Sequence, residues 1–401
     1  MRKLSILNSA ENIVTLPDIF ERPRKRTERI TGLAAVVAVI VIWVAGAFIG
    51  ESDSLPYLRK AMPAADRFER DADGHYTAFH DQTVIGYLYI GKANGYGGSM
   101  KIATAVDIKG RIVGAVIIDQ KETPSFLKKV LANRLFETLT GKSVSDPIIM
   151  GQDVDGITGA TYSSRAVISA VSESAHRIGK EKFNLKVPDP PPPEIKFGLP
   201  EITLLLLFIV WFKGREKKFK YTKQARWFSL LTGLVVLGFI CNTPLSLTKI
   251  TGLLLGYVPS WQRNIYWLLL IGGILLFLIL NKKNPYCQWF CPFGAAQECL
   301  GFIGGAKVKP PNRYRHFLKW TQRGLAFLAI ALAILFRSPG VAGYEIFSSF
   351  FSMTGSAFQM ILLVIILIAS LFLKRPWCKY FCPIPPVMDL IKMFRKWIGE
   401  I

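Results

Sequence analysis

The chain contains little cysteine and little histidine. It has six cysteines in 401 residues, and none lies between residues 51 and 196. Such sparse use argues against a secreted domain held together by disulfides. Histidine occurs only at positions 75, 80, 176 and 316, outside every long apolar run. A haem held between two histidines inside a membrane therefore has no candidate ligands.

Acidic residues are also scarce: 28 Asp and Glu stand against 50 Lys and Arg, for a formal net charge of +22, while 51% of the residues are hydrophobic. This combination is more typical of a polytopic membrane protein than of a nucleic-acid binder. Apolar stretches that approach the ~20 residues of a membrane span lie near residues 31–50, 197–213, 227–248, 264–281, 322–337 and 357–374.

The basic residues predict an orientation. They concentrate before residue 30, in the segments 214–226 and 282–321, and at the C-terminus, whereas 249–263 and 338–356 contain few. By the positive-inside rule, the basic segments and both termini are cytoplasmic. We therefore expect a multi-pass protein of the cytoplasmic (inner) membrane, in contact with lipid. Its predicted fold class is polytopic α-helical, with six transmembrane helices and an extracytoplasmic α/β domain.

The same patterns divide the chain. We expect a basic cytoplasmic N-terminus over 1–30, an uncleaved anchor helix over 31–50, the α/β domain over 51–187, a proline-rich linker over 188–196 and a five-helix membrane core over 197–401. Within the α/β domain, β-branched runs predict strands at 84–90, 101–108 and 112–118. Helical periodicity predicts helices at 125–139 and 163–178.

A Pro-x-Cys-x3-Cys-Pro pattern occurs twice, at 285–292 and 376–383, each time after an apolar run and a basic pair. Positions i and i+4 of a helix face the same way, so each copy can offer two thiolates to a soft metal centre. We expect both copies at the cytoplasmic face. Because clusters usually need four thiolates, one site shared by both copies is the simplest arrangement, with the ligands Cys287, Cys291, Cys378 and Cys382.

Other arrangements remain open. Two separate sites could each be completed by a further ligand, for which Cys299 is the spare thiol nearby. Zinc held by four thiolates is a second option. Cysteines that simply pack beneath the cytoplasmic surface are a third.

The second motif is Asp155-Gly-Ile-Thr-Gly-Ala-Thr161, followed by Tyr-Ser-Ser and an amphipathic run. Small residues and hydroxyls at the start of a helix predict an anion site, because the first N–H groups of a helix have no partner within it. An ordinary N-cap by Ser or Thr is the alternative.

This motif resembles the flavinylation motif of the FMN-binding domains in Rnf and sodium-pumping NADH:quinone oxidoreductase complexes, and in nitrous-oxide-reductase accessory flavoproteins. The resemblance implies that a flavin transferase attaches FMN to Thr161 through a phosphoester bond. It implies that the neighbouring cofactor-binding residues are Asp155, Gly156, Thr158, Gly159, Ala160 and Ser163. Segments 95–98 and 121–124 resemble family segments that line the flavin, which adds Tyr96, Gly97, Glu122, Thr123 and Pro124. Ser125 departs from the family pattern, where glycine is expected.

The cysteine motifs resemble the membrane iron–sulfur module of the same accessory flavoproteins, most specifically in Cys291-Pro-Phe-Gly-Ala-Ala-Gln-Glu298. The order of anchor, FMN domain and helical core also agrees. Long members of that family end in a ferredoxin domain with further cysteine runs, which this sequence does not contain. It is similar to the short form, the membrane flavoprotein associated with organohalide respiration.

The resemblance implies electron transfer through the membrane, from a quinol or cytoplasmic donor to an extracytoplasmic reductase system. An iron–sulfur cluster of unspecified type, FMN, the quinone pool and other redox subunits are the implied cofactors and partners. No role for nucleic acid is expected. A flavin outside and a cluster inside are separated by a hydrocarbon core of ~30 Å, which something must bridge. A redox-sensing regulator or assembly factor, and a metal-handling membrane protein, are alternative functions.

Overall fold

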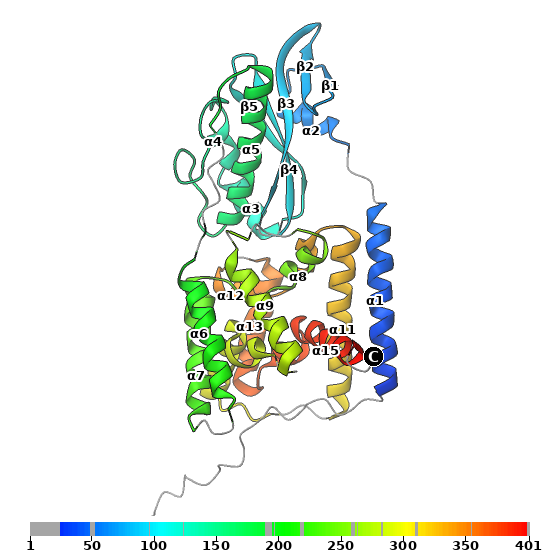
Figure 1. The fold of residues 1–401 in the computed structure, drawn as a ribbon, viewed down its shortest axis with the longest axis vertical. Coiled ribbons are helices and arrows are strands. Elements are labelled where there is room, and N and C mark those ends of the chain that lie inside the picture. Colours follow the sequence, from blue (N-terminus) through cyan, green and yellow to red (C-terminus); the bar gives the residue numbers. More distant parts are fainter. Residues whose placement is uncertain are drawn as a thin grey trace, which may run out of the picture.

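The computed structural model describes residues 25–398 apart from short gaps at 49–52, 96, 123, 189–194, 196, 217–219, 258–260, 263, 282–283, 309–311 and 354. Most of the proline-rich linker, Tyr96 and Thr123 lie in these gaps, outside the described residues. An α/β domain stands on one end of a helical core (Figure 1).

The α/β domain is built on a five-stranded antiparallel sheet in which each strand pairs with the next along the chain. Helix α2 (Leu55–Ala61) packs on one face of the sheet and α5 (Thr161–Lys182) on the other, with α3 (Pro124–Ala132) and α4 (Leu135–Leu139) beside α5. The strands are β1 (Arg67–Arg70), β2 (Tyr76–His80), β3 (Thr83–Asn94), β4 (Ser99–Asp107) and β5 (Ile112–Gln120).

The residue pattern of β4 explains this sandwich. Its side chains point alternately to the two faces of the sheet. Ile102 and Val106 join the hydrophobic core beneath α5, whereas Ala103 and Ala105 join the core beneath α2. Helix α5 approaches β3 so closely that a Cβ added to Gly91 would lie 2.1 Å from the Ala170 carbonyl oxygen. Burial on both faces holds the sheet and α5 as one unit.

The three predicted strands correspond to β3, β4 and β5, but two further strands were missed. Strand β1 lies at the sheet edge, where Arg and Glu side chains interrupt the apolar pattern, and β2 next to it is only five residues long. The predicted helix at 125–139 is two helices, α3 and α4. It breaks because Asn133 bonds its side-chain amide to the Lys129 carbonyl at 2.8 Å and Arg134 takes a left-handed φ of 54°.

The helical core contains a helix at each of the six predicted spans. These are α1 (Lys25–Ala47), α6 (Leu199–Gly214), α7 (Thr222–Thr232) continued by the π-helix η1 (Gly233–Ile240), α9 (Ile265–Asn281), α11 (Asn312–Leu335) and α13 (Ala357–Phe372). Within the described residues, two stretches are long and apolar enough to cross a membrane, 30–47 and 316–335. Residues 265–280 and 357–372 form shorter apolar helices.

Short elements connect these helices. The remaining ones are α8 (Leu247–Leu254), η2 (Tyr286–Phe290), α10 (Pro292–Ile303), η3 (Pro339–Ala342), α12 (Phe347–Phe351), α14 (Pro376–Tyr380) and α15 (Ile384–Ile398). Helix α1 packs along α11. A Cβ added to Gly46 of α1 would lie 2.9 Å from the carbonyl oxygens of Ile334 and Leu335. The α/β domain is therefore inserted between two helices of the core, α1 and α6.

Candidate functional site

The motif Asp155–Thr161 forms the loop that leads into α5. Gly159 has a φ of 76°, and a Cβ there would lie 2.5 Å from the Lys129 Nζ. The helix begins at Thr161 with Ala160 as N-cap, and no side chain caps it. The Ser and Thr hydroxyls of the motif therefore do not cap this helix. Ser164 instead accepts a hydrogen bond from the Ile157 amide at 3.1 Å and closes the loop.

This helix start has the features of an anion site. Thr161 is exposed, whereas Ser163 is 1% exposed and its Oγ has no hydrogen-bond partner among the described residues. The first amides of α5 have no acceptor within the helix, and the positive end of its dipole favours a negative group. A phosphate carried by Thr161 fits this position.

A pocket of about 380 Å³ adjoins the motif. The motif contributes its first four residues, and α3, α4 and the turn between them form the opposite wall; the lining is Lys129, Asn133, Leu135, Thr138, Asp155, Gly156, Ile157 and Thr158. The Lys129 ammonium adds a positive charge beside Gly159. The pocket therefore lies beside the loop that leads into α5 and has a positive charge in its lining.

The loop between β3 and β4 lies next to this helix start. A Cβ added to Gly95 would lie 3.6 Å from the Cβ of Ala166 in α5. The Gly97 amide donates to the Glu122 carboxylate at 2.7 Å, and Glu122 is 2% exposed. Segments 95–98 and 121–124 thus meet beside the motif, with Pro124 starting α3.

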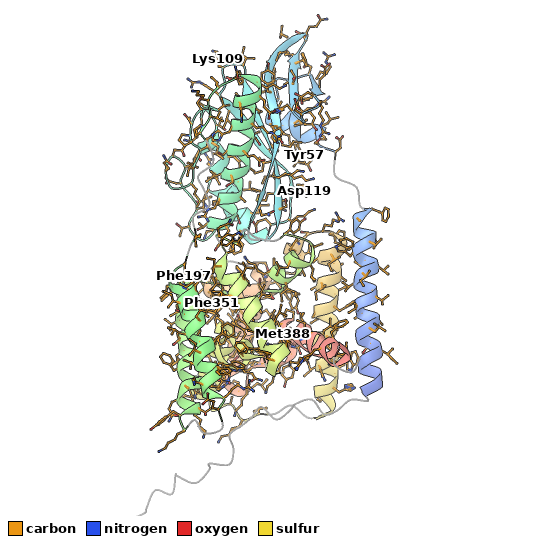
Figure 2. All side chains as sticks on the ribbon, in the orientation of Figure 1. Tyr57, Lys109, Asp119, Phe197, Phe351 and Met388 are labelled. Atoms are coloured by element: carbon orange, nitrogen blue, oxygen red, sulfur yellow. The ribbon has the colours of Figure 1, made fainter. Side chains whose placement is uncertain are left out.

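The motif end of the α/β domain rests on the helical core. Gly340 of η3 packs so closely on Glu122 that an added Cβ would lie 2.7 Å from its carbonyl oxygen, and Pro339 contacts Gly98. In Figure 2, Lys109 marks the opposite end of the domain, whereas Phe351 and Met388 lie within the core. The surface that carries the motif is therefore the surface that contacts the core.

Lys249 of α8 connects the two parts. Its ammonium lies 5.6 Å from the centre of the Tyr162 ring and 4.6 Å from that of Trp267. Tyr162 directly follows Thr161, and Trp267 is 7% exposed within the core. A cation placed over an aromatic face is attracted by the ring. Sequence reasoning did not single out Lys249, since nothing local distinguishes it from a solvated lysine.

The two cysteine motifs converge in the core. The thiols of Cys287, Cys291, Cys378 and Cys382 all lie within electrostatic reach of one another. Cys299 does not share this environment: among the described residues, Glu298 is the charged group that acts on its thiol. The structure therefore brings the four motif cysteines together from two copies and leaves the fifth apart.

Each of the four sulfur atoms has a hydrogen-bond donor nearby. The Asn284 amide donates to Cys287 Sγ at 3.1 Å, and the Gln297 amide donates to Cys378 Sγ at 3.3 Å. The backbone amides of Phe293 and Gly294 reach Cys291, and that of Ile384 reaches Cys382. Donors of this kind stabilise thiolates and tune the metal that they hold.

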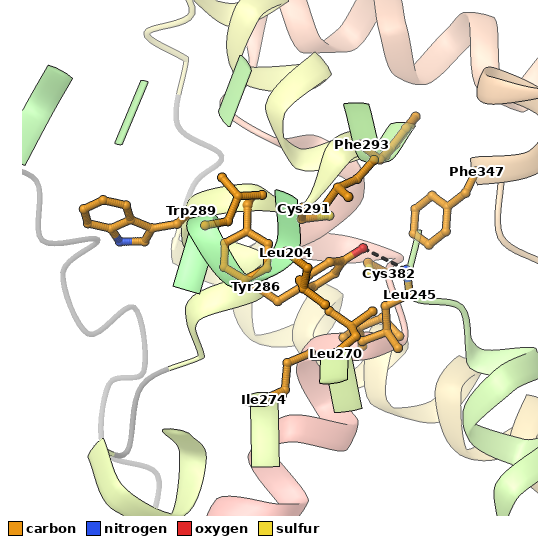
Figure 3. Close-up of a cluster of buried hydrophobic side chains, with 14 of the residues drawn as sticks. Leu204, Leu245, Leu270, Ile274, Tyr286, Trp289, Cys291, Phe293, Phe347 and Cys382 are labelled. Carbon is orange, nitrogen blue, oxygen red and sulfur yellow. Dashed lines mark hydrogen bonds between the residues drawn. The ribbon is translucent and has the colours of Figure 1, made fainter. Parts of the chain in front are cut away.

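The motifs fold back into the core from the ends of α9 and α13. Leu245, in the segment leading to α8, donates its amide to the Tyr286 hydroxyl at 2.8 Å (Figure 3). The Tyr344 hydroxyl, in the segment after η3, donates to the Phe381 carbonyl at 3.0 Å. Both segments belong to the side of the core that faces the α/β domain. Cys291 and Cys382 are buried among apolar side chains, and the expectation that both motifs lie at the cytoplasmic face stays a prediction.

The spacing of these thiols bears on the kind of metal. In the part of the chain that the structure describes, no three His, Cys, Asp or Glu side chains are close enough to share one metal ion. An iron–sulfur cluster places its four thiolates on different iron atoms, and the four motif cysteines match that number.

Comparison with known proteins identifies two domains. A family model described as an FMN-binding domain matches residues 95–176. A second, described as a 4Fe-4S binding domain, matches residues 264–311 and 357–399. The first match contains Thr161, and each half of the second contains one cysteine motif. The chain thus combines an FMN-binding domain with a 4Fe-4S binding domain.

Several curated proteins are similar to parts of the chain. The putative electron transport protein YccM of Escherichia coli is 28% identical over 155 residues, which is 35% of this chain and 42% of that protein. One component of the ion-translocating oxidoreductase complex of Vibrio vulnificus is 29% identical over 140 residues, which is 33% of this chain and 62% of that protein. Regulatory protein NosR of Pseudomonas aeruginosa is 25% identical over 200 residues, which is 45% of this chain and 27% of that protein. The chain spans less than two thirds of each.

Proposed function

We propose that this protein is a membrane electron-transfer flavoprotein that passes electrons between a four-cysteine iron–sulfur site in its helical core and an FMN on its α/β domain. The observation that carries the proposal is the position of Lys249. It packs between Tyr162, beside the proposed attachment residue, and Trp267, in the core. The contacts of this lysine support direct docking of the flavin end on the core. The names of the similar electron transport proteins support the same function.

In this proposal, all six predicted spans cross the inner membrane, with both termini cytoplasmic and the α/β domain outside. The helices at the six positions and the basic segments between them support this topology. Helices as short as α6 and α13 would cross with their ends in the interfacial region.

FMN would be attached to Thr161 through its phosphate, by a flavin transferase. The exposure of Thr161, the uncapped start of α5 and the unpartnered Ser163 hydroxyl support this position. Glu122 would hold the 95–98 loop beside the flavin through its bond to Gly97. Lys129 would balance part of the phosphate charge.

Cys287, Cys291, Cys378 and Cys382 would hold one cluster shared between the motif copies. FMN can take up one or two electrons, and an iron–sulfur cluster takes up one. Between them, Trp267 contacts Tyr266 at 6.0 Å between ring centres, and Tyr266 lies within electrostatic reach of Cys291. Through these contacts, an electron would move along a short series of packed side chains and would not have to cross ~30 Å of hydrocarbon in one step.

The outer partners follow from this arrangement. A quinol or cytoplasmic donor would deliver electrons to the core, and an extracytoplasmic reductase would receive them from the flavin. Glu201 lies in the first turn of α6. Its carboxylate accepts the Gly198 amide at 2.8 Å and caps α6, so it has a structural role in the described chain.

The test begins with cofactor content. Full-length protein co-expressed with a flavin transferase should fluoresce as a flavoprotein band on a denaturing gel, and should contain iron with visible absorption that dithionite bleaches. T161A should lose the fluorescent band while keeping its iron, and T161S should retain some of it. A fluorescent T161A band would refute the attachment site. Zinc in place of iron would refute electron transfer through the core.

A redox-sensing regulator is the second candidate, because one similar protein is named as a regulatory protein. The two functions differ in turnover. An electron carrier passes many electrons per molecule from a quinol to an outer acceptor, whereas a sensor is reduced once and stays reduced. Steady-state quinol oxidation in proteoliposomes distinguishes them.

A further inference from the structure

Arg375 belongs to the basic pair that precedes the second cysteine motif, where sequence reasoning counted it with the orienting charges. The structure places it elsewhere. Arg375 is 6% exposed, whereas its neighbour Lys374 is exposed. A membrane-orienting charge remains in water, so Arg375 needs another explanation.

The guanidinium of Arg375 ties the two motif copies together. It donates from Nη1 to the carbonyl of Cys287, in the first copy, at 2.6 Å. Its Nε lies 3.0 Å from the carboxylate of Glu298, which follows the first copy. Glu298 also accepts two hydrogen bonds from Arg226, at 2.7 and 2.9 Å. One carboxylate therefore serves two guanidinium groups, and positive charge is left over in this network.

This charge lies against the four thiols. A Cβ added to Gly294 would be 3.3 Å from Arg375 Nη1 and 3.5 Å from the Cβ of Cys291, so both groups flank the same small residue. Arg375 also interacts electrostatically with Cys378 and Cys287. Its Nη2 is buried without a hydrogen-bond partner among the described residues. A buried N–H of this kind is costly unless an acceptor such as sulfur satisfies it.

From this arrangement we propose that Arg375 is a positioning residue that sets the redox potential of the cluster held by both cysteine motifs. Reduction adds negative charge to a site that four thiolates already make negative. A buried positive charge beside it stabilises the reduced form, since net charge and hydrogen bonds to sulfur govern cluster potentials. The inference rests on the proposed cluster and adds which residue tunes it.

The experiment measures the midpoint potential of the cluster by redox titration with electron paramagnetic resonance, on full-length protein. R375Q should shift the potential downward at unchanged iron content. K374Q removes the same charge one residue away, at an exposed position, and should leave the potential unchanged. R375K should lie near the wild-type value because it keeps the charge. Equal potentials for R375Q, K374Q and wild type would overturn the inference.

Removing one partner of a buried ion pair can destabilise a protein, so a second comparison avoids a lone carboxylate. E298Q should raise the midpoint potential of the cluster, and the potential of the double variant E298Q/R375Q should be lower than that of E298Q. Equal potentials for these two variants would overturn the inference. If R375Q and the double variant both lose iron, R375K decides. If R375K retains its iron at an unshifted potential, the positive charge at position 375 sets the potential. If R375K loses its iron, the guanidinium has a purely structural role. Wild-type protein without any cluster signal would instead refute the proposed function.

Discussion

Lys249 of α8 lies over Trp267 of α9, with its ammonium 4.6 Å from the centre of the indole ring system. The same ammonium faces the Tyr162 ring of the FMN-binding domain. The Lys249 side chain therefore contacts an aromatic ring of the FMN-binding domain and one of the helical core.

Replacing this lysine should weaken docking. A cation–π contact contributes about 0.5–2 kcal/mol, so K249M should lower the docking equilibrium constant by roughly 2- to 30-fold and slow reduction of the flavin by the core. Stopped-flow reduction measures the rate, and hydrogen exchange at Gly97 reports exposure of the docking surface. K109M removes an exposed charge at the far end of the domain and should change neither. Equal effects of both variants would show that Lys249 has no special part in docking.

The four motif cysteines should act as one set. Because each thiolate would occupy one corner of a shared cluster, serine at any of Cys287, Cys291, Cys378 or Cys382 should remove most of the iron. C299S should keep it, since that thiol lies apart from the others. Iron per protein, measured by atomic absorption, gives the comparison. Half-occupied iron in the variants would instead indicate two independent sites.

Glycine at position 159 should be necessary for both conformation and space. G159A places a Cβ in a left-handed backbone, at a cost of about 1–2 kcal/mol, and also against the Lys129 ammonium. G141A has the same kind of strain, with a φ of 87°, but nothing within 4 Å of an added Cβ. Thermal unfolding should therefore show a larger loss for G159A, and only G159A should reduce flavin attachment. Equal losses would mean that the contact with Lys129 is unimportant.

Acid should loosen the loop that precedes the motif. Burial raises the pKa of Asp153, but hydrogen bonds from the Ile149 amide at 2.6 Å and from Lys142 at 3.2 Å outweigh it and hold that pKa below its usual value. A carboxylate with a lowered folded-state pKa stabilises the fold above its unfolded pKa of about 3.9 and loses this contribution as the pH falls further.

The pH dependence has a direct control. D153N should be less stable than the wild type at neutral pH, and its stability should change less below pH ~4. D155N alters an exposed carboxylate of the same loop region, and its acid sensitivity should match the wild type. Unfolding midpoints measured across this pH range decide the point, and parallel curves for D153N and wild type would contradict it.

Sequence patterns predicted much of this architecture because most of it is locally specified. Apolar runs located the helices, and β-branched runs located β3, β4 and β5. Strands β1 and β2 were missed because they are short, at four and five residues, and because charged side chains interrupt the apolar pattern of β1. The break between α3 and α4 escaped because it depends on the backbone of Arg134.

The sequence predicted which cysteines make up the site, but not how deeply they are buried in the core. The four cysteines were identified from their spacing, but their return into the core depends on tertiary contacts such as the bond between Tyr286 and Leu245. The burial of Arg375 and the position of Lys249 likewise arise from distant partners. A lysine or arginine that will be buried is indistinguishable, in one sequence, from one that will be solvated.

The FMN-binding domain continues at one end into α1 and at the other into α6, and α1 is packed on α11. Its docking is therefore an intramolecular event, for which short tethers provide effective concentrations in the millimolar range. An interface too weak to hold two separate proteins would still be occupied most of the time. Such an interface can open and re-form quickly, so the domain could turn its flavin from the core toward an external acceptor without ever leaving the surface.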